Sequence, residues 1–313
     1  MKTIQTINHH IDLSDFLTGK DEIIDISISN KGIDLLLIHT KPMYRISTPQ
    51  GTFSKIKSDK PKDFSFLRIG FDGGLVQKNR IPQQYFNFHY ACYLPAIEEL
   101  VLVSARCRYH NADNIDRNAR VFDLDGNFKR DFVMGDGIND IKVDTNDQLW
   151  TAYFDEGIFG NYGWELPIGM PGLIAWDHLG NQQWAYEPID GLNYMADCYA
   201  INIGEDNSIW FYFYTEFPLV QLNNQREIKF WETDLRGAGC INVWKGQVLF
   251  SGGYQEKDFH LYKIVGQELE KLEDISFQSS KGKKLQKRDY IRSTGATIGF
   301  LQDKKVYYTN LAR

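Results

Sequence analysis

The sequence predicts an all-β protein, a single β-propeller domain of six four-stranded blades spanning residues 1–313. Three observations lead to this prediction. A degenerate hairpin pattern recurs along the chain, aromatic residues make up 14% of it, and no long segment has the periodicity of an amphipathic helix. Aromatic side chains favour the pleated, half-buried surface of strands. Seven blades stay open as an alternative, because the repeats differ in length.

The clearest copies of the repeat place a polar tight turn between two apolar strands. Their apolar residues alternate with polar ones, as half-buried hairpins require. These copies run over residues 140–150, 200–210 and 297–307, with looser ones at 24–38, 90–103 and 240–250. A second hairpin with a Gly- or Asn-containing turn follows most of them. Its best copies are 119–128 and 173–182, and weaker ones are 43–53, 219–228 and 260–269.

Two consecutive hairpins make one blade, which must stack on its neighbours to bury both faces. This rule predicts blades at residues 23–57, 86–134, 138–187, 197–233, 239–272 and 295–311. Since the last range holds only two predicted strands, we expect the N-terminal segment Thr3–Ile11 to complete that blade. Residues 62–80 fit no blade, and Phe64–Val76 is interpreted as an extra hairpin.

Loop lengths predict which face of the propeller carries function. If the strands of a blade are called a to d, the a–b and c–d turns share one face, and the b–c and d–a connections share the other. The predicted a–b turns, such as 145–148 and 302–305, are short, whereas the b–c connections at 106–118 and 154–172 are long. Long loops on one side of a rigid scaffold are where binding residues concentrate. We therefore expect a functional top face around the mouth of the central channel.

The predicted top loops and channel-lining strands hold charged and aromatic side chains that suit a polar, partly anionic ligand or a protein. Arginine forms bidentate contacts with anions, which favours such a site. Ordinary structural roles stay open beside this one, because an Asp before a strand often bonds its own turn and Arg–Asp pairs often only join blades. The candidate binding residues are Arg106, Arg108, His110, Asp136, Asp155, Glu156, Tyr162, Trp164, Asp197, Arg236, Tyr254 and Arg292.

Charge and the lack of targeting patterns narrow the class of partner. A net charge of −6 disfavours nucleic acid and anionic membranes, whose binding needs a basic face. The basic run at 281–284, continued by Lys287 and Arg288, is interpreted as a solvated loop. No signal-peptide core or 18-residue apolar run is visible, and Cys92, Cys107, Cys198 and Cys240 lack metal-site spacing. We therefore expect a cytoplasmic protein with reduced, buried thiols.

The hairpin pattern resembles that of six-bladed NHL, gluconolactonase-like and two-component-regulator propellers. Over residues 86–260 the chain is also similar to an uncharacterised bacterial propeller family. The segments that carry this similarity are Asn118–Asp123, Gly135–Ile138, Tyr153–Gly160, Asp197–Asn202 and Phe217–Val220. The gluconolactonase-like resemblance implies a calcium- or zinc-type site of Glu, Asn and Asp in the channel. Such a likeness of fold does not by itself establish a function.

Two functions stay open. The first is a binding propeller without a cofactor, which engages a protein or a small polar molecule through its top face; an immunity-type protein would be a special case. The alternative is a metal-dependent hydrolase or lyase, which needs several oxygen or nitrogen ligands around an open position for water. The candidate metal ligands are Asp136, Asp140, Asp197 and His89. Because no catalytic motif occurs, the sequence leaves open whether the protein is an enzyme.

Overall fold

The computed structural model describes residues 2–29, 31–286 and 291–313, and these are almost entirely β-strands. They form six sheets of four or five strands and two separate two-stranded ribbons. The single helix among them, α1 (Asp155–Phe159), is one short turn. Six consecutive sheets, in which the strands follow the chain from one edge to the other except for two added N-terminal strands, are typical of propeller blades. The predicted six-bladed β-propeller is confirmed, and the alternative of seven blades is wrong.

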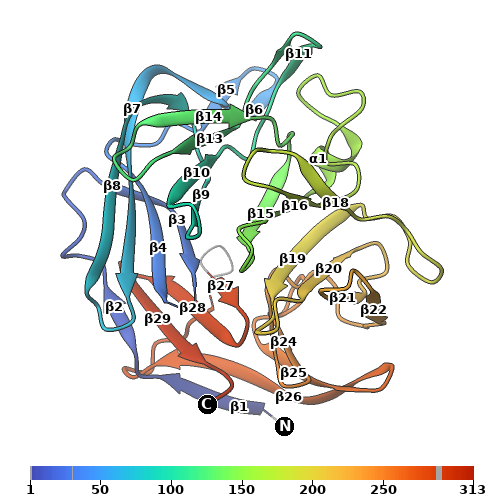
Figure 1. Ribbon diagram of the computed structural model, residues 1–313. Helices are drawn as coiled ribbons and strands as arrows, with labels where there is room; N and C mark the ends of the chain where they lie inside the picture. Colours follow the sequence, from blue (N-terminus) through green and yellow to red (C-terminus); the bar gives the residue numbers. More distant parts are fainter. Residues whose placement is uncertain (1, 30, 287–290) are drawn as a thin grey trace. The chain divides into compact units, whose positions relative to one another are not determined.

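The chain divides into two compact units, and the first of these, which we call the middle unit, comprises residues 17–26 and 32–187. Its three blades can be followed from blue to yellow-green in Figure 1. Their strands are β3 (Glu22–Ile28, whose last two residues belong to the other unit), β4 (Gly32–Ile38), β7 (Lys57–Gly70) and β8 (Leu75–Phe86); β9 (Tyr90–Leu94), β10 (Glu99–Val103), β13 (Ala119–Phe122) and β14 (Phe128–Phe132); and β15 (Ile138–Val143), β16 (Leu149–Tyr153), β17 (Leu173–Trp176) and β18 (Gln182–Ala185).

The second unit, which we call the terminal unit, comprises residues 1–16, 27–31 and 188–313. Its blades are built from β19 (Asp197–Ile203), β20 (Ile209–Tyr214), β21 (Leu219–Leu222) and β22 (Ile228–Trp231); β23 (Ile241–Trp244), β24 (Gln247–Phe250), β25 (Phe259–Val265) and β26 (Glu268–Ser279); and β27 (Ile291–Thr294), β28 (Thr297–Gln302) and β29 (Lys305–Asn310), joined by N-terminal strands. Lys287 and Arg288 of the predicted basic loop lie outside the described residues.

Each unit has its own apolar core between adjacent blades. In the middle unit Leu36, Phe64, Phe66, Leu100 and Phe122 belong to one buried cluster. These residues lie on the first two blades, so the alternating apolar positions of neighbouring sheets meet in one core. The buried interior fixes the strands, and the loops at their ends are therefore held in place.

The outer half of the first blade differs from the prediction. Residues 43–53 were expected to be its outer hairpin, but they contribute to a separate ribbon of β5 (Arg45–Thr48) and β6 (Gly51–Ser54). The outer strands are instead β7 and β8, around the segment interpreted as an extra hairpin. The reason is burial: Phe64, Phe66 and Ile81 are fully buried, whereas every side chain of β5 is exposed. A strand without a buried side cannot hold a place in the sheet.

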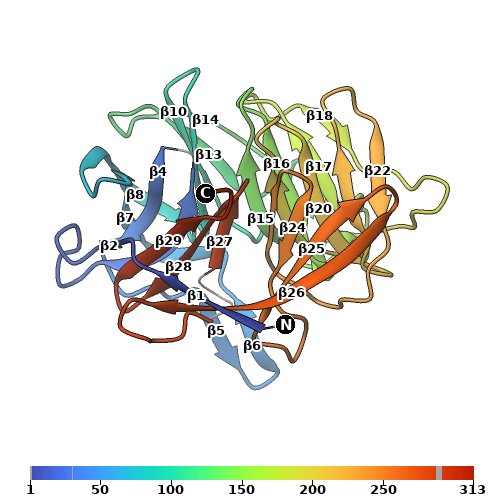
Figure 2. The same cartoon turned by 90° about the horizontal axis from the view of Figure 1, so that it is seen from below.

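The N-terminal segment completes the last blade, as predicted, but only with its second strand. Strand β2 (His10–Asp12) pairs antiparallel with β29, Ile11 lying opposite Val306. Strand β1 (Lys2–Ile7) instead runs parallel to β26 of the preceding blade, as Figure 2 shows. The last blade also has a strand of its own, β27, before the predicted start at 295. The turn at 302–305 therefore joins strands b and c of that blade, and its prediction as an a–b turn is wrong.

Candidate functional site

The middle unit has one long connection in each blade, always between the second and third strands of its sheet. These connections are residues 39–56, 104–118 and 154–172, and we call them the three inserts. The first contains the β5–β6 ribbon, the second contains a ribbon of β11 (Tyr109–Asn111) and β12 (Asn114–Ile115), and the third contains α1. The second and third were predicted to be long b–c loops. The first was not predicted, because residues 43–53 were assigned to the outer hairpin of the first blade.

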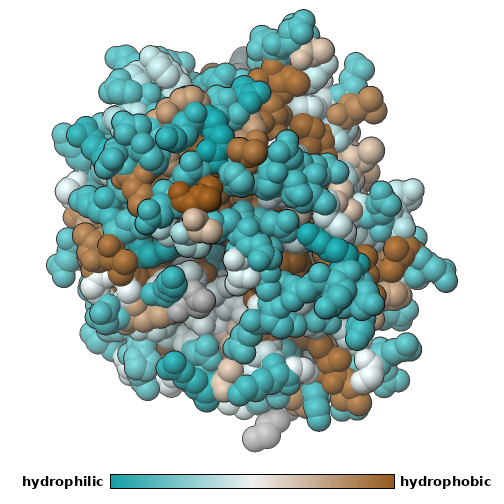
Figure 3. Space-filling model, in the orientation of Figure 1, coloured by the Kyte–Doolittle hydropathy of each residue, from teal (hydrophilic) through white to brown (hydrophobic). Residues whose placement is uncertain are grey.

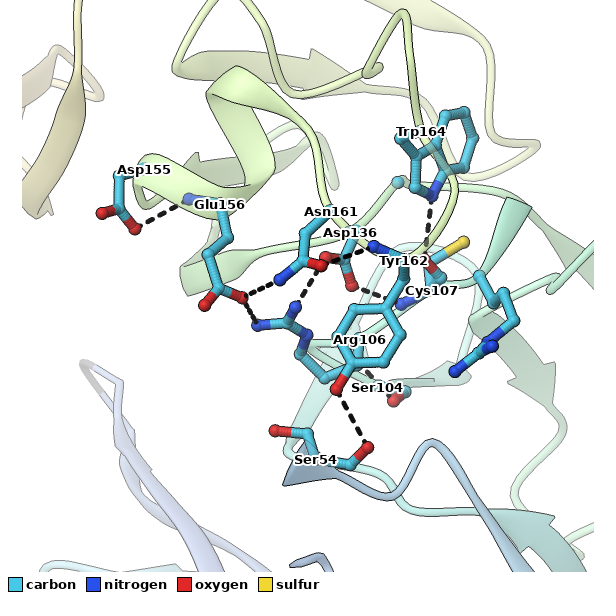
Figure 4. Close-up of polar contacts among 12 residues, drawn as sticks. Ser54, Ser104, Arg106, Cys107, Asp136, Asp155, Glu156, Asn161, Tyr162 and Trp164 are labelled. Carbon is cyan, nitrogen blue, oxygen red and sulfur yellow. Dashed lines mark hydrogen bonds and ion pairs between the residues drawn. The ribbon is translucent and has the colours of Figure 1, made fainter. Parts of the chain in front are cut away.

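Arg106 of the second insert is a buried cation at the junction with the third insert (Figure 4). Its Nη2 donates to Oδ2 of Asp136 at 2.8 Å, and its Nη1 lies 2.6 Å from Oε2 of Glu156. The guanidinium also lies over two rings, 4.5 Å from the centroid of Tyr162 and 5.4 Å from that of Phe154. The side chain of Arg106 is 8% exposed and that of Asp136 is 1% exposed, so this ion pair is poorly solvated, whereas the side chain of Glu156 is 45% exposed.

The two carboxylates paired with Arg106 have opposite pKa shifts. Burial raises the pKa of Asp136 to about 6, against the attraction of Arg106 and the N–H of Cys107, which donates to Oδ1 at 2.7 Å. For Glu156, burial also raises the pKa, but hydrogen bonds from Arg106 and from Asn161 at 2.7 Å outweigh it and lower the pKa. Asp136 therefore titrates near pH 6, whereas Glu156 stays ionised.

Two glycines allow the carboxylates to approach Arg106 together. Gly137 has a φ of 70°, and a Cβ there would lie 2.3 Å from the backbone nitrogen of Gly157. A Cβ on Gly157 would lie 2.5 Å from the carbonyl oxygen of Asp136. The backbones on either side of Asp136 and Glu156 are thus in contact, which only glycine permits. Both glycines lie in segments that carry the resemblance described above, Gly135–Ile138 and Tyr153–Gly160.

Tyr162 and Trp164 of the third insert tie it to the other two. The hydroxyl of Tyr162 donates to the carbonyl of Ser54 at 3.1 Å, and the indole Nε1 of Trp164 donates to the carbonyl of Cys107 at 2.8 Å. The amide of Tyr109 donates to the carbonyl of Tyr162 at 3.0 Å. The three inserts therefore form one connected surface, which we call the insert surface.

The structure gathers six of the predicted site residues in and around this cluster: Arg106, Arg108, Asp136, Glu156, Tyr162 and Trp164. Arg108 is exposed, with its guanidinium 5.1 Å from the ring centroid of Tyr162. Asp155 and His110 are also exposed, and Asp155 accepts the amide of Glu156 at 2.7 Å. Phe154 and Asn161 were not among the predicted site residues. Phe154 lies within the segment Tyr153–Gly160, and Asn161 follows it directly.

The other four predicted residues belong to the terminal unit. The amide of Tyr254 donates to the carbonyl of Arg236 at 3.0 Å, and its ring covers Gly237, where a Cβ would lie 2.5 Å from ring atoms. Tyr254 thus anchors two loops while staying half-exposed. Asp197 is the first residue of β19, and Arg292 lies on β27.

The candidate metal ligands of the middle unit have other partners. His89 accepts the amide of Ala105 at Nδ1, 3.1 Å away, and burial lowers its pKa to about 4. Asp140 lies 3.3 Å from Nζ of Lys142. Over residues 2–29, 31–286 and 291–313, no group of three or more His, Cys, Asp and Glu side chains is arranged to hold a metal ion. The four cysteines are buried thiols outside any disulfide, and burial raises the pKa of Cys92 and Cys107.

A Ser–His–Asp arrangement occurs elsewhere in the middle unit. Nδ1 of His39 lies 2.6 Å from Oδ1 of Asp21, and its Nε2 lies 2.8 Å from Oγ of Ser65. These are the contacts of a catalytic triad. Ser65, however, is 2% exposed and lies in β7 between β4 and β8. A substrate cannot reach it there, so we interpret the three residues as a structural tie within the first blade.

Replacing His39 with alanine should lower the free energy of unfolding by about 1–3 kcal/mol, because Asp21 and Ser65 would lose buried hydrogen bonds. Denaturant unfolding measures this loss, and Ser65→Ala, which removes only one of the two contacts, is the matched control with a smaller effect. The wild-type protein should also fail to react with a fluorophosphonate probe. Covalent labelling of Ser65 would show that the arrangement is catalytic.

Comparisons with known proteins agree with the fold and define its class. The chain is a six-bladed β-propeller, and it is similar in structure to the virginiamycin B lyase from Staphylococcus aureus (13% identity, TM-score 0.50, covering 95% of this chain and 97% of that one). It is likewise similar to a streptogramin B lyase (10%, 0.50, 96% and 96%). A putative gluconolactonase has 11% identity and a TM-score of 0.40, covering 93% of this chain and 92% of that one.

At the level of sequence, residues 186–309 match the model of the YxzG family. No curated protein sequence matches the chain. At such low identities the likeness to solved structures concerns the fold alone. No helix among the residues that the structure describes has the length and apolar character to cross a membrane.

Proposed function

We propose that the protein is a binding propeller that engages another protein through the insert surface of the middle unit. One observation carries this proposal: the three inserts are tied together beneath, and the first and third present large apolar side chains to solvent. Exposed apolar side chains near aromatic residues and arginine are typical of protein interfaces. Those on the inserts are Met43, Ile46, Phe53, Phe159, Leu166 and Met170.

The buried contacts favour a scaffolding role for Arg106 over direct contact with a ligand. Its two terminal nitrogens are engaged by Asp136 and Glu156, and its Nε is buried without a hydrogen-bond partner among the residues that the structure describes. A guanidinium so placed holds the inserts in one arrangement, which reduces the entropy lost when a partner binds. The exposed Arg108 and the apolar side chains would then make the contacts themselves.

A protein partner suits this surface better than a small polar molecule, because its exposed groups are spread over three inserts. On the face of the molecule that Figure 3 shows, hydrophobic side chains occur in small groups among hydrophilic ones. An immunity-type protein that neutralises a toxin is a special case of this proposal. We also propose a cytoplasmic location, which is supported by the four buried cysteines, all of them thiols outside any disulfide.

The alternative, a metal-dependent hydrolase or lyase, has less support. The solved structures with similar folds include lyases, but that likeness concerns fold alone. In the middle unit His89 accepts a backbone amide and Asp140 lies near Lys142, so neither points to a vacant ligand set.

Replacing Asp155, Glu156, Tyr162 and Trp164 together with alanine should abolish capture of the partner by immobilised protein, because the inserts would no longer be held together. The matched control is Tyr85→Ala with Phe128→Ala, which removes two half-exposed rings of the same unit outside the inserts. Quantitative mass spectrometry of captured proteins measures the effect, and circular dichroism checks that both variants keep their β-structure. Capture that survives the quadruple change, or is lost equally in the control, would contradict the proposal.

A further inference from the structure

The β5–β6 ribbon is an unusual element, because it belongs to no blade. Its register places Ile46 opposite Phe53, and these side chains are 48% and 46% exposed. Directly paired residues of antiparallel strands project from the same face, so the two make one apolar side. Met43, at the base, is 60% exposed. A two-stranded ribbon is marginally stable in water by itself, which makes an uncovered apolar pair on it notable.

The base of this ribbon is nevertheless firmly held. The buried side chain of Asn87 donates to the carbonyls of Met43 and Lys55. The amide of Lys55 donates to the carbonyl of Tyr44 at 2.8 Å, and the hydroxyl of Tyr44 donates to the carbonyl of Phe88 at 2.5 Å. Figure 2 shows the ribbon extending away from the strands of its blade. A projecting element with an ordered base is suited to contact another molecule.

The charge of the first insert is opposite to that of the whole protein. Residues 39–56 contain Lys41, Arg45 and Lys55 and no Asp or Glu, although the net charge of the chain is −6. Lys55 pairs with Asp59 at 2.5 Å, whereas Lys41 and Arg45 are exposed. Arg45 directly precedes Ile46 in β5, so its side chain projects from the face of the ribbon opposite the apolar pair. The complementary segment therefore has apolar side chains on one face and carboxylates on the other.

One backbone edge of the ribbon is also open. Among the described residues β5 pairs only with β6, so its other edge presents backbone N–H and C=O groups. The outer edge of β6 is partly occupied, because the carbonyl of Ser54 accepts a hydrogen bond from the hydroxyl of Tyr162. An extended segment can add to an open edge through backbone hydrogen bonds, while alternate side chains confer specificity.

We propose that the β5–β6 ribbon binds an extended segment of a partner protein in which apolar residues alternate with Asp or Glu. The segment adds along β5, with its apolar side chains over Ile46 and Phe53 and its carboxylates beside Lys41 and Arg45. This inference rests on the proposed function and specifies the chemistry of the partner. An anionic membrane is less favoured, because two cations contribute only about 1 kcal/mol each at such a surface and the acidic remainder of the protein is repelled.

A fluorescent strand-length peptide of alternating Glu and Leu is the probe. It should bind the wild-type protein, and Ile46→Ser with Phe53→Ser, or Lys41→Glu with Arg45→Glu, should weaken binding at least about tenfold. Added salt should weaken it too, since the contact is partly ionic. The control is Leu75→Ser with Val76→Ser, which removes two exposed apolar side chains, 49% and 64% exposed, from the start of β8 in the same blade. This control should bind like the wild type.

Three results would overturn the inference: no binding of the Glu–Leu peptide, equal binding of a Lys–Leu peptide, or ribbon-dependent binding to phosphatidylserine vesicles in place of the peptide. The ribbon variants keep Arg106, Tyr162 and Trp164, so failure here can be separated from failure of the proposed function. If the quadruple alanine variant loses partner capture but neither the Glu–Leu nor the Lys–Leu peptide binds the wild-type protein, only the ribbon inference is wrong. Unchanged melting temperatures of the ribbon variants, whose sites are exposed, show that folding is intact.

Discussion

Replacing Arg106 with leucine should lower the free energy of unfolding by about 3–5 kcal/mol, because it leaves the buried carboxylate of Asp136 without its cation. The loss should depend on pH. The pKa of Asp136 is raised from 3.8 to about 6, so its protonated form favours folding below about pH 4, and this contribution is lost as the pH rises through 6. The variant should therefore be closest to the wild type near pH 4 and furthest from it at pH 8. Denaturant unfolding at both pH values measures the difference.

A double variant with Arg106→Leu and Asp136→Leu is the informative control for that experiment. It removes both buried charges and should recover much of the lost stability, since an apolar pair can replace a buried ion pair at little cost. A loss that is the same at pH 4 and pH 8, and that the double variant does not reduce, would show that Arg106 acts by packing on Tyr162 and Phe154.

Deleting residues 1–12 should destabilise the terminal unit by about 5 kcal/mol or more. The deletion removes β1 and β2 together with the buried side chains of Ile7 and Ile11, and burial of each such side chain contributes about 1.5–3 kcal/mol. The lost ladder hydrogen bonds add about 1 kcal/mol each. It should also promote aggregation, because the edges of β26 and β29 become open to other chains. Thermal unfolding and light scattering measure the two effects.

Two smaller changes measure the contributions of β1 and β2 to stability separately. Deleting residues 1–7 removes β1 alone and leaves the last blade with four strands, whereas Ile11→Ser weakens only β2. Both should be milder than the full deletion, and both give a folded protein if the longer truncation does not. An unchanged melting temperature with monomeric behaviour after deletion of residues 1–12 would mean that neither strand stabilises its sheet.

The hairpins of the second to fifth blades could be predicted from the sequence because their signal is local. Residues 140–150 and 200–210 alternate apolar and polar positions around a polar turn, and the structure has β15–β16 and β19–β20 there. The first blade misled the prediction for a physical reason. Its third strand, β7, begins with a charged stretch and Pro61, whereas residues 43–53 do contribute to a hairpin, but its side chains are mostly exposed and it stays outside the blade.

The candidate site was predictable only in its location. Long b–c connections indicated where Arg106, Tyr162 and Trp164 would lie, but not what they would contact. Asp136 lies 30 residues from Arg106, and Tyr162 lies 108 residues from Ser54. Such contacts depend on how blades stack, which no local pattern records. Hence the sequence could not distinguish an exposed, ligand-binding Arg106 from the buried, ion-paired one in the structure.

The pairing of β2 with β29 also has a consequence for the newly made chain. His10 lies opposite Tyr307, so one strand leaves the ribosome almost a whole chain length before its partner. At about 5–20 residues per second, β2 waits roughly 15–60 s with nothing to pair with. During that time Ile7 and Ile11, which are buried in the finished protein, are open to water and to other nascent chains. A chaperone that holds this segment during synthesis would therefore raise the yield of folded protein more than it would change its stability.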